Sequence, residues 1–269
     1  GPNPTAQNAS YSTDEIGTYG GRSHGSSVAI NLAMLVSDAR GTFQISTLRT
    51  PTHGKVNLAQ GVATYIPDAF WNGTDSFGYT ITNELNQTSN EGVVTITVNP
   101  VNDKPILTST VVSELFTVNQ TKAISGVSFA DMDVGPVALT LTIQTTSGTV
   151  TAGGKSGSAI TLSGSTVTLN QHLAGLQYLS AVDQATSGSI SITVNDNANG
   201  GAGGALSDTI AIAVWPIVTP VASPQSYTVL VNAPMVKDAA TGLLRGASGT
   251  NGRSFSVVDN TNPTRGTLQ

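Results

Sequence analysis

The sequence predicts an all-β fold, and three observations support this prediction. Only 10% of the 269 residues are charged, against roughly 25% in an average soluble domain, and Gly supplies 29 residues. Thr and Val, which favour strands, outnumber the usual helix formers Lys and Glu. Five short segments alternate strictly between apolar and small polar residues, while helical spacing is nearly absent. Together these features are typical of many short strands joined by turns.

The five alternating segments are the expected strands, and each is expected to bury one face because successive side chains of a strand point to opposite sides. They are Phe77–Ile81, Val94–Val98, Leu139–Ile143, Ile190–Val194 and Ile210–Val214. The segment from Leu169 to Ala181 is the only expected short helix or turn, and Gly175 weakens it as a helix.

Two sequence stretches occur twice in the same order, which indicates an internal repeat. The stretch "PTAQNASYSTDE" from Pro4 parallels "PVASPQSYTVLV" from Pro220. Further along, "PTHGKV" from Pro51 parallels "PTRGTL" from Pro263, at nearly the same offset. The chain is therefore expected to contain related units in tandem.

Proline-rich passages mark the expected boundaries between units of about a hundred residues, the usual size of a small β-sandwich. The passages "VNPVNDKPIL" and "AVWPIVTPVASP" should act as short, semi-rigid spacers, because proline fixes φ and extends the residue before it. We expect one sandwich at 1–102, a second at 103–216, and the N-terminal half of a third at 217–269.

The third unit is expected to be incomplete, since it lacks counterparts of "GVATYIP", "DSFGYTIT" and "VVTITV". A half-sandwich would expose unpaired strand edges. Two interpretations remain open: the chain is a segment of a longer array, which we favour, or another subunit donates the missing strands and the chain is a filament subunit.

Composition also excludes several classes of protein and site. The chain has no Cys, so disulfides, thiolate zinc sites and cysteine nucleophiles are excluded. The sequence contains no cluster of Lys and Arg of the kind that binds nucleic acid. It also contains no apolar run long enough to insert into a membrane. The three His residues lie far apart in the sequence, and His24, in "GGRSHGSS", is expected at the surface. The cluster "GGAGGA" lacks the Lys-Ser/Thr of a phosphate loop and is interpreted as a flexible turn. An enzyme is therefore not expected.

Longer motifs carry a resemblance to a known family. The stretches "ATYIPDAFWNGTDSFGYTITN" and "GVVTITVNPVNDKP", followed by "VSFADMDVG" and "ITVNDNANGGAGGALSDTIAIAV", resemble the cadherin-like and VCBS-type tandem repeats of large secreted or cell-surface adhesins. The resemblance implies immunoglobulin-like β-sandwiches in an extended array, located outside the cell. It implies as partners the neighbouring repeats, identical subunits, or a glycan or protein of a surface.

The resemblance also implies calcium at the junctions between repeats, because Ca²⁺ takes six to eight oxygen ligands from acidic loops. Asp131 and Asp133 in "ADMDVG" could reach one ion, and the "NDN" at 195–197 matches the family's partner loop. The candidate ligands are Asn102, Asp103, Glu114, Asp131, Asp133, Asn195, Asp196, Asn197 and Asp208. The alternative interpretation is that these residues only form turns, as Asp and Asn commonly do.

Calcium is expected only in the middle unit and at its borders. The loop Leu35–Ser46 contains Asp38 as its single carboxylate, and its counterpart Leu243–Ser256 contains none. The function predicted from the sequence is a structural or adhesive extracellular rod that spaces, displays or cross-links. A module that binds a glycan or protein through loops such as Thr18–Ser27 is a further hypothesis.

Overall fold

The computed structural model describes residues 3–37, 41–133 and 137–217. The predicted half-unit at 217–269 lies outside these residues except for Ile217, as does Asp38. The first repeat contains β1 (Thr5–Ala6), β2 (Ala9–Asp14), β3 (Gly17–Tyr19), β4 (Arg22–His24), β5 (Val28–Asn31), the 3₁₀-helix η1 (Leu32–Leu35), β6 (Val36–Ser37), β7 (Phe43–Arg49), β8 (Gly54–Ala59), β9 (Val62–Pro67), β10 (Gly73–Asn83) and β11 (Gly92–Asn99).

The second repeat contains β12 (Ile106–Ser109), β13 (Ser113–Phe116), β14 (Thr121–Ala123), β15 (Val127–Ala130), β16 (Leu139–Thr145), β17 (Thr149–Ala152), β18 (Lys155–Gly157), β19 (Ala159–Gly164), α1 (Thr166–Ala174), β20 (Gln177–Leu179), β21 (Gly188–Asn195) and β22 (Ser207–Pro216). The fold is therefore all-β, as the sequence predicts.

The first repeat is a sandwich of a four-stranded sheet, ordered β2-β11-β10-β7, and a three-stranded sheet, ordered β5-β9-β8. The second strand, β2, runs parallel to the last strand, β11, with Val94 opposite Ala9 and Asn99 opposite Asp14. The alternating residues of β10 and β11 point inward, which places Phe77, Tyr79 and Ile96 in a core that excludes water. Burial of each such side chain contributes about 1.5–3 kcal/mol.

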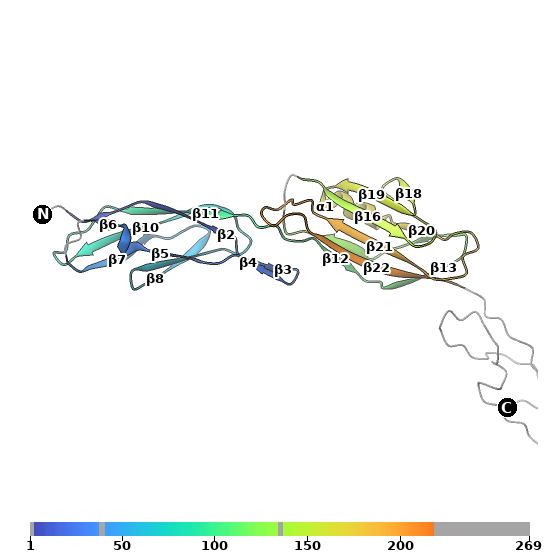
Figure 1. Ribbon diagram of the computed structural model, residues 1–269, viewed down its shortest axis with the longest axis horizontal. Coiled ribbons are helices and arrows are strands. Elements are labelled where there is room, and N and C mark those ends of the chain that lie inside the picture. Colours follow the sequence, from blue (N-terminus) through green and yellow to red (C-terminus); the bar gives the residue numbers. More distant parts are fainter. Residues whose placement is uncertain (1–2, 38–40, 134–136, 218–269) are drawn as a thin grey trace, which may run out of the picture.

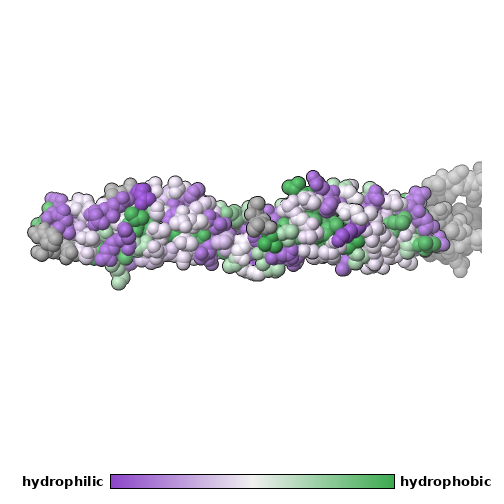
Figure 2. Space-filling view, turned by 90° about the horizontal axis from the view of Figure 1, so that it is seen from above, coloured by the Kyte–Doolittle hydropathy of each residue, from purple (hydrophilic) through white to green (hydrophobic). Residues whose placement is uncertain are grey.

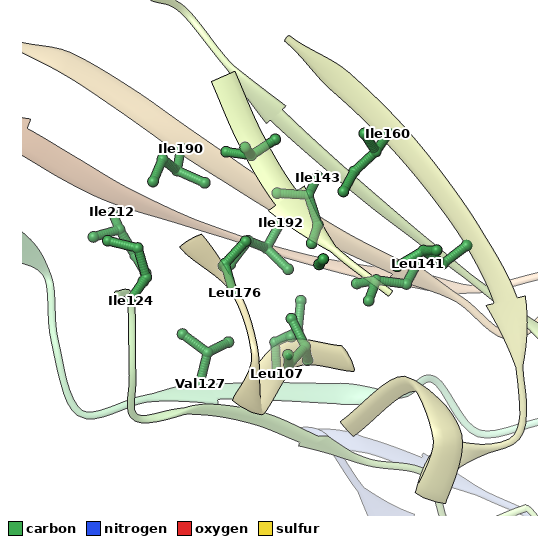
Figure 3. Packing of buried hydrophobic residues seen from close by; sticks show 14 of the residues in the cluster. Leu107, Ile124, Val127, Leu141, Ile143, Ile160, Leu176, Ile190, Ile192 and Ile212 are labelled. Carbon is green, nitrogen blue, oxygen red and sulfur yellow. The ribbon is translucent and has the colours of Figure 1, made fainter. Parts of the chain in front are cut away.

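The second repeat packs a five-stranded sheet, ordered β13-β22-β21-β16-β19, against a four-stranded sheet, ordered β14-β20-β17-β18. Leu141, Ile143, Ile190 and Ile192 lie fully buried between them, and Figure 3 shows how closely these side chains pack. No buried residue is shared by the two core clusters, so each repeat has its own core. The boundaries 1–102 and 103–216 stay a proposal.

All five predicted strands are confirmed, within β10, β11, β16, β21 and β22. The predicted helix is only partly correct. The helix α1 begins after Ser165, whose hydroxyl accepts a hydrogen bond from the Thr168 amide, and it ends at Gly175. The residues after Gly175 form β20, because Tyr178 points into the core and the strand pairs with β17.

The two repeats lie end to end, and β3 and β4 project from the first towards the second (Figure 1). In the space-filling view of Figure 2 the described residues form one slender rod, with polar and apolar side chains interspersed on the visible face. Among the helices of the described residues, none has the length and apolar character needed to cross a membrane.

Candidate functional site

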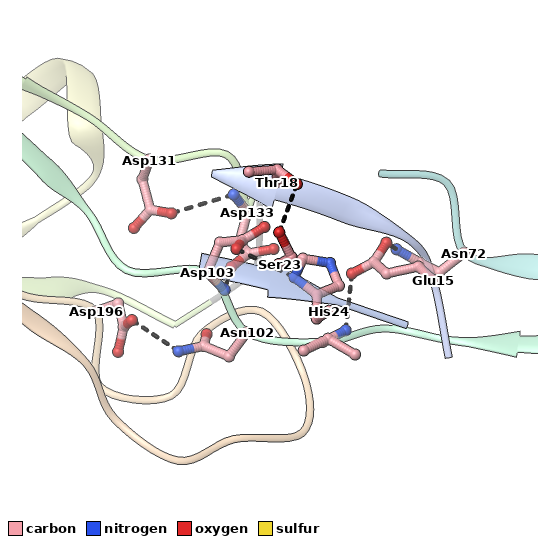
Figure 4. A network of polar contacts seen from close by, with 11 residues as sticks. Glu15, Thr18, Ser23, His24, Asn72, Asn102, Asp103, Asp131, Asp133 and Asp196 are labelled. Carbon is pink, nitrogen blue, oxygen red and sulfur yellow. Dashed lines mark hydrogen bonds and ion pairs between the residues drawn. The ribbon is translucent and has the colours of Figure 1, made fainter. Parts of the chain in front are cut away.

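Buried polar side chains gather where the chain passes from β11 of the first repeat to β12 of the second (Figure 4). Glu15 and Asp103 are 3% exposed, Asn102 is 2% exposed, and Asp196 is completely buried. Charged side chains are rarely buried this deeply without partners. This junction is therefore the candidate functional site.

Asn102 fixes the linker to the second repeat by using all of its polar groups. Its side-chain amide donates to Oδ2 of Asp196 (2.7 Å) and to the Gly204 carbonyl (2.9 Å). Its Oδ1 accepts a hydrogen bond from the Gly200 amide (2.6 Å), and its backbone amide donates to the Ala202 carbonyl (2.8 Å). The linker therefore has one defined path through the junction.

The glycine-rich loop between β21 and β22 forms the wall around the linker. A Cβ at Gly200 would lie 2.0 Å from Cγ of Asp133, and one at Gly201 would lie 2.4 Å from the Pro100 carbonyl oxygen. Gly201 also has φ of +132°, which other residues rarely adopt. The interpretation of these glycines as a flexible turn misses this role, since they are needed for close approach to the linker.

Glu15, at the end of β2, binds the linker from the side of the first repeat. Its Oε1 accepts a hydrogen bond from the Val101 amide (2.7 Å), and its Oε2 accepts one from the Asn72 side chain (3.1 Å). Its own amide donates to the Asn99 carbonyl (2.9 Å). The sequence analysis missed Glu15. It lies far from the linker along the chain, and only the fold brings it next to Val101.

Asp103, Asp131 and Asp133 form the acidic cluster of the junction. Asp133 accepts a hydrogen bond from the Asp103 amide (2.6 Å), and Asp131 accepts one from the Asp133 amide (3.1 Å). One oxygen of Asp103 and one of Asp131, Oδ2 in each case, are buried without a hydrogen-bond partner. Such orphaned carboxylate oxygens are costly inside a protein.

The electrostatics of the cluster reflect this crowding of negative charge. Burial raises the pKa of Asp131 to about 6, and the charges of Asp133, Asp196 and Asp103 add to that increase, while the hydrogen bond from the Asp133 amide opposes it. Burial, with the neighbouring Asp103 charge, likewise raises the pKa of Asp133. The site therefore favours positive charge.

His24 lies at the same place, although the sequence predicts it at the surface. Its Nδ1 is 3.5 Å from Oδ1 of Asp103, its side chain is 13% exposed, and its Nε2 is buried without a partner. Burial raises the pKa of Asp103, whereas the nearby His24 and Arg22 charges lower it. The sequence signal for this placement is weak, because His24 is far from Asp103 along the chain and belongs to a hairpin that only the fold directs towards the linker.

The other candidate ligands have structural partners. Asp208 pairs with Lys104 (Nζ to Oδ1, 3.3 Å) and accepts a hydrogen bond from the Leu107 amide (2.8 Å). Asn195 and Asn197 form the turn after β21, with the Asn197 amide donating to Oδ1 of Asn195 (2.7 Å). Glu114 does not approach the first linker. It lies on β13, beside the C-terminal end of β22, and pairs with Lys122 at 2.9 Å.

Calcium fits this site in donor type and charge, because the orphaned oxygens of Asp103 and Asp131 are the hard ligands that Ca²⁺ prefers. In the ranges that the structure describes, no three or more His, Asp or Glu side chains are arranged to hold a metal ion. The fit is therefore one of donor chemistry and charge.

The family model of the bacterial Ig domain matches residues 2–97. No curated protein sequence matches the chain. Among solved structures, human mucin-like protocadherin EC1-2 is 10% identical, with 80% of this chain and 98% of that chain covered and a TM-score of 0.43. Human CDH23 EC21-23 is 14% identical, with 87% and 76% covered and a TM-score of 0.44.

An endo-fucoidan hydrolase of glycoside hydrolase family 107, MfFcnA9, is 16% identical over 80% of this chain and 34% of that chain, with a TM-score of 0.26. At these identities and scores the solved structures carry no argument about function. The family match covers the first repeat, which is therefore similar to the bacterial Ig domain, and the described residues form two β-sandwiches in tandem.

Proposed function

We propose that this chain is a segment of an extracellular rod that spaces, displays or cross-links, with its repeats coupled at the junction described above. The observation that carries this proposal is the linker, whose Asn102 and Asp103 side chains are buried between two sandwiches placed end to end. Ig-like and cadherin-like folds are adhesion-type modules, usually extracellular and typically non-enzymatic.

The junction supports a stiff connection between the repeats. Domains in one chain move relative to each other unless a substantial interface holds them. Here Glu15 of the first repeat makes a partly buried hydrogen bond to the linker, and Asn102 of the linker makes a buried one to the second repeat. Pro100 and Pro105 further restrict the backbone between β11 and β12. A stiff connection between repeats lets a tandem array hold whatever it carries at one end at a fixed distance from its other end.

Calcium is part of the proposal, with Asp103, Asp131 and Asp133 as the residues that would hold it. The ion would supply the positive charge that these crowded carboxylates need. Asp196 would support the site through Asn102, because its Oδ2 accepts a hydrogen bond from the Asn102 side chain while its Oδ1 accepts hydrogen bonds from the amides of Ala198 and Leu206. Asp196, Asn195, Asn197 and Asp208 could bind the ion directly only by giving up some of the hydrogen bonds or ion pairs that they make within the protein.

The partners proposed for the array are its own neighbouring repeats or identical chains. The alternative of a filament completed by another subunit concerns residues 217–269, of which only Ile217 is described. The glycan-binding or protein-binding module stays a hypothesis, because no contact in the described residues favours it over the rod.

Small-angle X-ray scattering combined with calorimetric titration of CaCl₂ tests the proposal. We expect an elongated particle, and heat of Ca²⁺ binding that is lost in the Asp131→Asn/Asp133→Asn variant. The matched control is Asp183→Asn, which removes an exposed carboxylate paired with Asn119 in the second repeat. A compact particle would contradict the rod, and the absence of calcium binding in the wild type would contradict the calcium site alone.

A further inference from the structure

The hairpin of β3 and β4 forms a two-stranded sheet of its own. Among the described strands, β3 and β4 pair only with each other, with Thr18 opposite Ser23 and Tyr19 opposite Arg22. The two-residue turn Gly20–Gly21 has φ of +56° and +78°, the combination that a tight hairpin turn with two positive φ values requires. The hydroxyls of Thr18 and Ser23 lie 2.8 Å apart across the strands. The hairpin is therefore a formed element that projects from its sandwich.

Phe70 holds the base of this hairpin. Its ring packs edge to face against the rings of Tyr19 and His24. The centroid of the Phe70 ring lies 6.4 Å from that of Tyr19 and 6.2 Å from that of His24. A Cβ at Gly17 would lie 2.3 Å from the Phe70 ring, so only glycine allows the hairpin to lie so close. Phe70 itself has φ of +58°, a strained value for an aromatic residue, and its amide donates to the Ile16 carbonyl (2.8 Å).

The tip of the hairpin lies against the linker and the start of the second repeat. A Cβ placed on Gly20 would be 2.9 Å from Cε of Lys104 and 3.5 Å from Cδ1 of Ile106, the first residue of β12. His24 at the other end of the hairpin approaches Asp103 at 3.5 Å. Figure 4 shows the hairpin, with Thr18, Ser23 and His24, beside the acidic cluster.

The charges agree with this placement. Burial raises the pKa of Tyr19, and the charges of Asp131, Asp103 and Asp133 add to that increase. The Arg22 charge lowers the pKa of Asp103. The hairpin thus brings a cationic side chain and two aromatic or imidazole rings to the face of the junction where negative charge is concentrated.

We infer that the β3–β4 hairpin is a clamp that couples the two repeats through protein contacts, so that the junction stays ordered without a bound cation. The second repeat of the same chain is the partner of this surface. The inference rests on the proposed function for the rod but not on the calcium site. Its consequence is that chelation alone leaves the angle between the repeats unchanged.

Spin-label distance measurements between the repeats test the clamp. The chain has no Cys, so Asn57→Cys and Ser163→Cys, two exposed positions in the first and second repeats, label without background. The clamp variant is Gly20→Asn, because Asn at this turn position keeps a favoured Asn-Gly hairpin while its Cβ would lie 2.9 Å from Cε of Lys104, so that the Lys104 side chain must move away. The matched control is Gly21→Asn, since a Cβ there meets no atom within 4 Å. Tyr19→Ala/His24→Ala is a second clamp variant, which removes contacts instead of adding bulk.

In chelator, we expect a narrow distance distribution for the wild type and for Gly21→Asn, and a broadened one for both clamp variants. If Ca²⁺ restores a narrow distribution in the clamp variants, the clamp and the calcium site are both supported. If the clamp variants stay broad in Ca²⁺ and the wild type binds none by calorimetry, the calcium site fails and the clamp stands. A broad wild-type distribution in chelator, or clamp variants as narrow as the wild type, would overturn the inference.

Discussion

The hydroxyl of Tyr65 donates a hydrogen bond to Oδ2 of Asp75 (3.0 Å) inside the first repeat. Asp75 is 3% exposed and also accepts hydrogen bonds from Thr52, His53 and Ser76. The carboxylate of "GTDSF" thereby holds the backbone of "PTHG". This contact gives a physical reason why these two motifs occur together in the same repeat.

We expect Asp75→Ala to destabilise the first repeat by about 3 kcal/mol, because several buried donors lose their acceptor together. Tyr65→Phe removes one donor and should cost about 1 kcal/mol. Urea unfolding followed by Trp71 fluorescence measures both, since Trp71 packs against the core of this repeat. Equal losses for the two variants would show that Asp75 does not hold the "PTHG" backbone.

The stability of the first repeat should also depend on pH through Asp75. Burial tends to raise the pKa of Asp75, but the hydrogen bonds from Thr52, His53, Ser76 and Tyr65 outweigh it and lower the pKa. Stabilisation from a lowered pKa is present above the unfolded value of about 3.9 and is lost as the pH falls through the folded value. Thermal unfolding monitored at Trp71 should therefore show a falling midpoint below about pH 4. Asp75→Asn should lack that part of the decrease, and an unchanged pH profile in this variant would contradict the assignment.

The two cores should respond to mutation separately. Ile143 is fully buried in the second repeat, so Ile143→Ala leaves a cavity and should cost about 2–5 kcal/mol. Trp215 on β22 reports on this repeat and Trp71 on the first, and the chain has no other tryptophan. We expect the Trp215 transition to shift alone. A matching shift at Trp71 would mean that the repeats unfold as one cooperative unit.

Gly200→Ala should disturb the junction, because its Cβ would overlap the Asp133 carboxylate. We expect a loss of about 1–3 kcal/mol in the second repeat and weaker Ca²⁺ binding by calorimetry. Gly175→Ala is the control, since a Cβ there has only ordinary contacts, the nearest at 3.7 Å. Similar effects of the two substitutions would indicate a general cost of replacing glycine.

The sequence predicts those parts of the fold that depend on local pattern. Strict alternation identifies β10, β11, β16, β21 and β22, because one buried face of a strand leaves a period of two in the sequence. The helix is misplaced at its C-terminal end, since the apolar residues Leu176 and Tyr178 suit a helix or a strand equally well until β17 supplies a partner.

The junction could be predicted only in part, because some of its residues are far from the linker along the chain. The motifs containing Asn102, Asp103, Asp131 and Asp133 are visible in the sequence, and the structure brings them together. Glu15 and His24 reach the same place from the first repeat through contacts that no local pattern encodes. Glu114 is the opposite case. It is close to the linker in the sequence, but β13 pairs with the C-terminal end of β22 and so carries Glu114 away from the junction.

The parallel pairing of an N-terminal strand with the last strand of each repeat has a mechanical consequence. In the first repeat β2, near the N-terminal end, and β11, at the C-terminal end, pair side by side over six residues. Tension between the two ends therefore loads all hydrogen bonds of this ladder in shear, and they must break together instead of one after another. In the second repeat the corresponding ladder of β13 and β22 spans four residues. Under a stretching force, the shorter ladder is expected to yield first, so the second repeat would extend while the first remains folded.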